Sequence, residues 1–88
     1  MTEQASLIKY PCDFPIKIMG KSQGNFAQLA VSIVKQHAPD FDETTLETKT
    51  SKSGMYLSLT CTIRATSRIQ LDALYQALSD HPMVSVAL

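Results

Sequence analysis

The chain has 88 residues, of which 44% are hydrophobic and 18% are charged, a composition typical of one folded domain with a modest core rather than of a disordered chain. Eight basic residues balance eight acidic ones and give a formal net charge of zero. This balance argues against a dedicated nucleic-acid-binding protein, which usually has a basic excess, and leaves little electrostatic repulsion against self-association.

The sequence also bears on localisation. Its apolar runs are only a few residues long, too short for a membrane-spanning helix, and the N-terminal residues MTEQASLIKYPC lack the basic and apolar regions of a secretory signal. Cys12 and Cys61 are far apart and form no CxxC motif, which is typical of reduced thiols. We therefore predict a cytoplasmic protein with no membrane partner.

The first segments in chain order are an extension and a strand. Residues 1–13 have mixed polarity and no sustained period, and we interpret them as an N-terminal extension that precedes one domain over residues 14–88. Residues 14–20 alternate between inward-facing apolar and outward-facing side chains, which predicts a strand. Because proline lacks an N–H donor, Pro15 is expected at the start of this strand or in a bulge.

A turn and a helix follow this strand. Residues 20–25 contain Gly20 and Gly24, both of which can adopt positive φ, and predict a turn. Over residues 26–37 apolar side chains recur at helical spacing, which predicts an amphipathic helix. Pro39 ends this helix, because the residue before a proline avoids the helical region.

The middle of the chain has the pattern of a hairpin. Threonine-rich residues 44–51 suit an edge strand, and residues 52–54 suit the turn that follows. Residues 54–66 have the clearest pattern in the chain, an apolar set that alternates with a polar set. The apolar members are Met55, Leu57, Leu59, Cys61, Ile63 and Ala65. We therefore predict a central strand with one face on the core and the other face polar.

The last segments are a helix and a strand. Ser67 followed by Gln70 is a capping-box pattern that predicts the start of a second helix. This helix is expected to present an apolar face that includes Ile69, and to end before Pro82. Residues 83–88 are uncharged and predict a short last strand.

The order of strand, helix, strand, strand, helix and strand predicts an α+β fold, because the helices are amphipathic and the strands alternate. With right-handed crossovers this is a ferredoxin-like βαββαβ sandwich, in which a four-stranded antiparallel sheet has two helices on one face. In this topology the third strand lies beside the first inside the sheet, and the second and fourth strands form its edges.

No set of side chains in the sequence has the pattern of a catalytic or metal site. Cys61 is predicted to point into the core, and neither His37 nor His81 has another ligand-type residue at metal-binding spacing. We therefore predict no enzyme activity, no metal and no cofactor. One enzymatic alternative is a small acyl-phosphate hydrolase, which would need an arginine near the turn at Asn25, whereas Arg64 is expected at the far end of its strand.

The polar face of the predicted sheet is the main candidate for function. Its members on the first and third strands are Lys17, Met19, Tyr56, Ser58, Thr60, Thr62 and Arg64. An RNA-recognition domain of this fold would display several aromatic side chains there for base stacking, and Tyr56 is the only one. RNA binding is therefore an alternative, and a contact surface for a protein or a small ligand is favoured.

The last strand predicts self-association. Residues 84–88 contain no charge, proline or glycine, whereas the edge strands of natural sheets usually carry such residues to prevent pairing with another chain. Either the N-terminal extension covers this edge or a second subunit pairs with it. We predict a homo-oligomer that forms through an edge strand.

Several short pieces of the sequence, taken together with their order and spacing, are similar to those of a known family. They are Tyr10-Pro11 with Phe14, Lys17-Ile18-Met19-Gly20, His37-Ala38-Pro39, Ser51-Lys52-Ser53-Gly54 with Tyr56 and Ser58, Ala65-Thr66, Leu74-Tyr75 with Leu78, and Val84 with Leu88. In this set the chain resembles the small bacterial proteins of the YbeD type, a family of unknown function. The resemblance implies a fold similar to ACT regulatory domains, which bind small molecules near the turn after the first strand. It also suggests a link to lipoate metabolism, because genes of this family often lie near lipoate-synthesis genes.

We therefore expect a non-catalytic regulatory or adaptor domain that binds a small metabolite or a partner protein. Its ligand or partner surface is predicted to combine the turn after the first strand with the polar face of the sheet. The candidate residues are Met19, Gly20, Gly24, Asn25, Tyr56 and Ser58.

Overall fold

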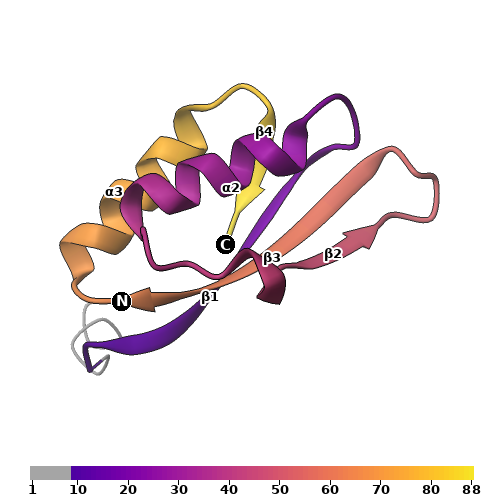
Figure 1. Cartoon of the computed structure of the whole chain (residues 1–88). Coiled ribbons are helices and arrows are strands. Elements are labelled where there is room, and N and C mark those ends of the chain that lie inside the picture. Colours follow the sequence, from indigo (N-terminus) through magenta and orange to yellow (C-terminus); the bar gives the residue numbers. More distant parts are fainter. Residues whose placement is uncertain (1–8) are drawn as a thin grey trace.

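The computed structural model describes residues 9–88, and residues 1–8 of the predicted N-terminal extension lie outside the described residues (Figure 1). The elements in chain order are β1 (Cys12–Lys21), α2 (Phe26–His37), the 3-10 turn η1 (Glu43–Thr45), β2 (Glu47–Thr50), β3 (Tyr56–Ala65), α3 (Arg68–Asp80) and β4 (Val84–Ala87). Each predicted strand and helix is present in the predicted order, and the bounds of α2 are those predicted.

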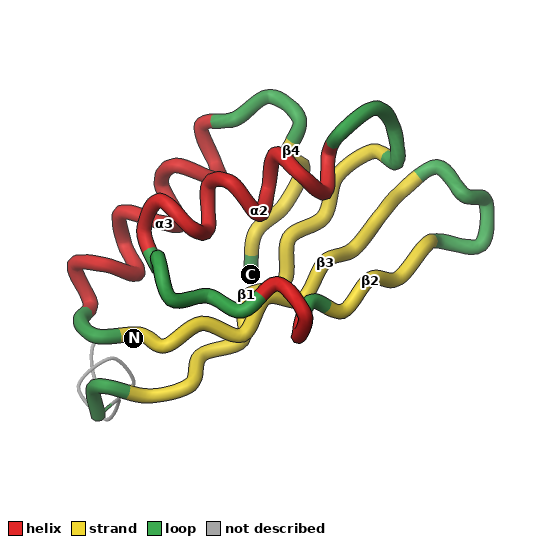
Figure 2. Tube along the Cα trace, in the orientation of Figure 1, coloured by secondary structure: helices red, strands yellow, loops and turns green. Residues whose placement is uncertain are grey.

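The strands form one antiparallel sheet in the order β2-β3-β1-β4. β1 and β3 pair along their whole length, from Cys12 opposite Ala65 to Lys21 opposite Tyr56. The helices α2 and α3 pack against each other on one face of the sheet, and the hairpin of β2 and β3 extends beyond them (Figure 2). This arrangement confirms the ferredoxin-like α+β fold. In the described part of the chain, neither helix has the length and apolar character needed to cross a membrane.

The core lies between the helices and the sheet. Its members follow from the alternation of apolar residues along the strands and from their helical spacing along α2 and α3. Alternate residues of β1 and β3 meet the apolar stripes of α2 and α3. The side chains with at most 1% exposure are Ile16, Ile18, Phe26, Ala30, Val34, Ala38, Leu59, Cys61, Ile63, Ala65, Leu74 and Leu78. Burial of a large aliphatic side chain of this kind stabilises the fold by about 1.5–3 kcal/mol.

The start of α3 is fixed by the predicted capping box. The Ser67 hydroxyl accepts a hydrogen bond from the Gln70 N–H at 3.1 Å. The Gln70 side chain accepts a bond from the Thr66 N–H at 2.7 Å and donates one to the carbonyl of His37 at 2.8 Å. Gln70 therefore joins the first turn of α3 to the last residue of α2, in addition to capping its own helix.

Ile69 does not belong to the core, although the sequence pattern placed it on the apolar face of α3. Its side chain is 81% exposed, and the buried residues of this helix are Leu71, Leu74 and Leu78. Ile69 precedes Leu71 by two positions, which puts the two side chains on nearly opposite sides of a helix. The exposure of Ile69 therefore follows from the positions of the buried leucines along α3.

The second strand begins at Glu47, so the predicted start at Thr44 was wrong. The Asp42 carboxylate accepts hydrogen bonds from the N–H of Thr44 at 3.0 Å and from its hydroxyl at 2.7 Å. The Thr45 hydroxyl donates to the Asp42 carbonyl at 2.7 Å. These local bonds favour the 3-10 turn η1 over an extended strand, despite the strand propensity of threonine.

Pro15 lies inside β1, opposite Thr62, rather than at the start of the strand or in a bulge. The backbone of Lys17 exchanges hydrogen bonds with Leu88, so the odd-numbered residues of β1 direct their backbone groups toward β4. The pairing of β4 with β1 does not extend past Lys17, and among the described residues no strand lies beside Pro15 on that side. The missing N–H of Pro15 consequently removes no hydrogen bond from the sheet.

Candidate functional site

No segment within residues 9–88 covers the face of the sheet opposite the helices, which we call the open face, and the register places its side chains in rows. Met19 lies opposite Ser58 on one side and opposite Val86 on the other. Lys17 lies opposite Thr60 in the next row and exchanges backbone hydrogen bonds with Leu88. Because side chains alternate along each strand, these residues point away from α2 and α3.

Apolar side chains on this open face form a continuous band. We call Tyr56, Met19, Val86 and Leu88 the apolar band. Tyr56 is 45% exposed, Val86 40% and Leu88 65%. Met19 is half-buried and, with Tyr56 and Ser58, lines a shallow hollow of about 150 Å³. The band therefore crosses from the start of β3, over β1, to the edge strand β4.

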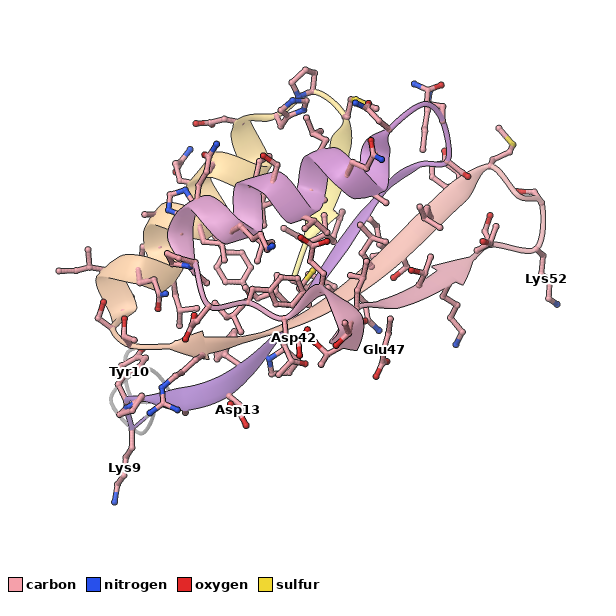
Figure 3. The ribbon with its side chains drawn as sticks, in the orientation of Figure 1. Lys9, Tyr10, Asp13, Asp42, Glu47 and Lys52 are labelled. Carbon is pink, nitrogen blue, oxygen red and sulfur yellow. The ribbon has the colours of Figure 1, made fainter. Side chains whose placement is uncertain are left out.

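Charged and hydroxyl groups flank the apolar band. Lys17, Glu47, Lys49 and Thr60 line a second hollow of about 230 Å³ beside the band, whereas Arg64 and Asp13 lie opposite each other at the far end of the sheet. Asp13 and Glu47 both point away from the helix layer (Figure 3). Acidic and basic groups are thus mixed around the apolar centre, as they are at the rim of many protein interfaces.

The turn after β1 lines a separate cavity on the helix side of the sheet. Gly24, Asn25, Phe26 and Leu57 are among the residues around its volume of about 420 Å³. Gly24 has φ of +57°, so it provides the positive φ expected in this turn. Asn25 is the residue before α2, and its side chain makes no capping hydrogen bond.

Gly20 has a packing role that the sequence did not reveal. It is buried in β1 rather than part of the turn, and its φ is not positive. A Cβ at this position would clash with the carbonyl oxygen of Met83 and would lie 2.6 Å from Cε1 of Phe26. Only glycine permits this approach of the first residue of α2 to the sheet.

The structure therefore divides five of the six predicted site residues into two groups. Met19, Tyr56 and Ser58 share the open face, while Gly24 and Asn25 line the turn cavity behind the sheet. Gly20 lies buried near both. The two groups are at the same end of the sheet, because β1 ends at Lys21, opposite Tyr56.

A larger groove was not predicted from the sequence. It has a volume of about 660 Å³ and lies between α2 and the segment that leads into β2. Ala27, Val31 and Leu46 contribute apolar surface, and the Lys35 ammonium pairs with the Glu43 carboxylate at one side. The sequence did contain an indication of this groove. Ala27 and Val31 are four residues apart and so lie on the same side of α2, which makes its apolar stripe wider than predicted.

The titratable groups do not assemble into a reactive centre in residues 9–88. Burial raises the pKa of the Cys61 thiol to about 11, which keeps it protonated at neutral pH and makes it a poor nucleophile. No group of three His, Cys, Asp or Glu side chains within the described range could hold a metal ion. Asn25 and Arg64, which the hydrolase alternative would need together, lie at opposite ends of the sheet.

Comparison with known proteins places the chain in a family. The model of a family described as "Protein of unknown function (DUF493)" matches residues 5–88. The chain belongs to this family. UPF0250 protein NE1487 of Nitrosomonas europaea is 72% identical over 88 residues, covering all of both chains. A UPF0250 protein of Bordetella pertussis is 56% identical over 85 residues, covering 97% of this chain and 93% of the relative. The resemblance to YbeD-type proteins is thus confirmed.

A solved structure supports the fold. The solution structure of protein HP0495 from H. pylori matches with a TM-score of 0.73, covering 92% of this chain and 85% of that chain. The sequence identity is 20%, so this likeness concerns the fold alone. The family is one of unknown function, and the site must therefore be interpreted from its own geometry.

Proposed function

We propose that the protein is a non-catalytic adaptor or regulatory domain whose open sheet face binds a partner protein. The observation that supports this most is the apolar band. Folding explains why β3 has an apolar face toward the helices, but it gives no reason for Tyr56, Val86 and Leu88 to remain exposed together. Exposed apolar surface with a mixed-charge surround is typical of a site of protein–protein contact.

The side chains of the band suit a protein better than they suit RNA. Among the described residues of the open face Tyr56 is the only aromatic one, whereas base recognition on sheets of this fold uses several. Tyrosine and methionine are enriched at protein interfaces, where their large apolar surface is buried on binding. The zero net charge of the chain also provides no excess attraction for a phosphate backbone.

The test compares two matched surface variants. The double variant Tyr56→Ser/Val86→Ser removes two of the four apolar side chains of the band, and Ile69→Ser removes an exposed apolar side chain of α3 that lies elsewhere. We expect the wild-type chain and Ile69→Ser to capture the same specific protein from lysate of the native cell, and the double variant to lose it. Equal capture by all three chains would reject the open face as the binding surface.

A small metabolite is the second candidate ligand, because the turn cavity offers about 420 Å³ beside Gly24 and Asn25. Any ligand that binds the native state raises its melting temperature. We expect a thermal-shift panel of amino acids and lipoate-pathway compounds to give a stabilising compound whose effect is reduced in Asn25→Ala. The absence of a shift with every compound in the panel would exclude this ACT-like version of the function.

A further inference from the structure

The edge strand β2 has backbone groups that no other described segment uses. It is the outermost strand on its side of the sheet, and all four of its residues are exposed. The Ser51 N–H donates to the Tyr56 carbonyl, so the odd-numbered residues of this strand direct their backbone groups toward β3. The N–H and C=O groups of Thr48 and Thr50 therefore point to solvent.

The side chains of β2 alternate in a way that matters for pairing. Glu47 and Lys49 lie opposite Thr60 and Ser58, so they are on the open face. Figure 3 shows Glu47 pointing away from the helix layer. Thr48 lies opposite Leu59 and is therefore on the helix side of the sheet. The strand thus presents one negative and one positive charge, two residues apart, on the same face.

We propose that two copies of this chain associate through β2, antiparallel about a two-fold axis at Thr48. In this register Thr48 lies opposite Thr48 of the other copy, and the two residues exchange both backbone hydrogen bonds. Glu47 of each copy then lies opposite Lys49 of the other. The edge is self-complementary in charge, which is what a two-fold interface requires.

The alternative registers are less favourable. Pairing of Thr48 with Thr50 of the other copy would put Lys49 directly opposite the other Lys49, and like charges in that position repel. Pairing of Thr50 with itself would leave both Glu47 and Lys49 without an opposite charge. Only the Thr48 register satisfies the solvent-facing backbone groups and also joins both pairs of charges.

The groove beside α2 is next to this junction. Leu46, which lines the groove, immediately precedes β2 and is half-buried. The two-fold arrangement would bring the grooves of the two copies toward each other on the helix side of a continuous sheet. This dimer pairs through the backbone of β2 and leaves the side chains of the apolar band uncovered, although Lys49 also lines the hollow beside Met19 and Tyr56.

The opposite edge is a weaker candidate, although the sequence pattern favoured it. The register between β1 and β4 shifts after Met19, because Met19 lies opposite Val86 and Gly20 lies opposite Val84. Ser85 is the extra residue of this bulge. A bulge disrupts the ladder of an edge strand and is a common means of preventing edge-to-edge association.

A charge-reversal cycle tests the proposal by sedimentation equilibrium of the whole chain at low ionic strength. We expect the wild-type chain to show a reversible monomer–dimer equilibrium. Glu47→Lys and Lys49→Glu should each weaken dimerisation about tenfold, because each converts both cross-strand pairs to like charges. The double reversal Glu47→Lys/Lys49→Glu recreates the opposite pairs and should restore dimerisation. Lys52→Glu, in the hairpin turn, is the matched control and should have little effect.

A covalent trap tests the register. Residues directly opposite in a hydrogen-bonded antiparallel pair have Cα atoms about 5.5 Å apart, which is within the range of a disulfide. In a Cys12→Ser background we expect Thr48→Cys to give a disulfide-linked dimer on oxidation and Thr50→Cys to give none. Three results would overturn the proposal: a monomer at all concentrations, a double reversal no better than the single ones, or equal cross-linking of the two cysteine variants.

Discussion

Leu59 and Ser58 are neighbours on β3, and the sheet separates their surroundings. Leu59 is fully buried against the helices, and its environment accounts for its identity. Ser58 lies on the open face beside Met19, where no described segment covers it. The two faces are therefore under different constraints. Substitutions on the core face should change stability, whereas substitutions on the open face should change binding and leave stability nearly unaltered.

The largest effect is expected for Leu59→Ala. Truncation of a fully buried leucine removes its transfer free energy and leaves a cavity, so the free energy of unfolding should fall by about 2–5 kcal/mol. Thr62→Ala, on the open face of the same strand, should change it by less than about 0.5 kcal/mol. Urea denaturation of both variants checks the contrast, which fails if the two losses are similar.

A smaller loss is expected for Gly20→Ala. The new methyl group would meet the Met83 carbonyl and the Phe26 ring, so overpacking should cost about 1–3 kcal/mol. Gly24→Ala is the matched change, because its φ of +57° is unfavourable for alanine but nothing lies within 4 Å of the added Cβ. It should cost about 1 kcal/mol. A more harmful Gly24→Ala in the same denaturation assay would show that the structure relieves the close approach at Gly20 for less than the cost of a positive φ in alanine.

The cap of α3 should rank next. Ser67→Ala removes the acceptor for the Gln70 N–H and should lower the free energy of unfolding by about 1 kcal/mol. Ser67→Asp keeps an acceptor at the same position and should retain most of the stability. Thermal denaturation of the two variants shows whether stability depends on the capping hydrogen bond or on any change at this position. Equal losses of stability in Ser67→Ala and Ser67→Asp would argue against the cap.

The smallest effect on stability concerns Asp42, whose pKa is lowered by hydrogen bonds from the hydroxyl and N–H of Thr44. A carboxyl with a lowered pKa in the folded state stabilises the protein above its ordinary pKa, and this stabilisation is lost as the pH falls through the folded pKa. Thr44→Val removes the hydroxyl donor and should raise the pKa of Asp42, as measured by an NMR titration. An unchanged titration would show that the Thr44 hydroxyl does not contribute.

The sequence predicted those features that follow from periodicity and failed where tertiary contacts decide. The alternation in β3 and the stripe of α2 depend on residues close in sequence, and most of both was predicted correctly. Met55 is an exception, because it precedes β3 and is 60% exposed instead of facing the core. Val31 is the other exception, because it is buried although the predicted stripe of α2 did not include it. Pro15 and Gly20 could not be interpreted in this way, because their roles depend on how far β4 pairs with β1 and on how closely Phe26 approaches. Ile69 was misplaced although the spacing of Leu71, Leu74 and Leu78 already defines a stripe that excludes it.

The candidate site was predictable to the same extent. Parity along the strands placed Met19, Tyr56 and Ser58 on one face, as observed. Val86 joined them only through the register of β4, which contains a bulge that no sequence pattern indicated. The groove beside α2 also depends on the position of the segment leading into β2. Gly24 and Asn25 lie on the helix side of the sheet, away from the open face, and this separation also depends on the folded sheet rather than on the local sequence.

The stability of Tyr56→Ser/Val86→Ser is the sharpest test of whether the apolar band exists for binding. Both side chains are at least 40% exposed, so their removal should change the free energy of unfolding by less than about 1 kcal/mol in urea denaturation. A loss comparable to that of Leu59→Ala would mean that the band supports the fold. That result would contradict the assignment of the open face to a partner.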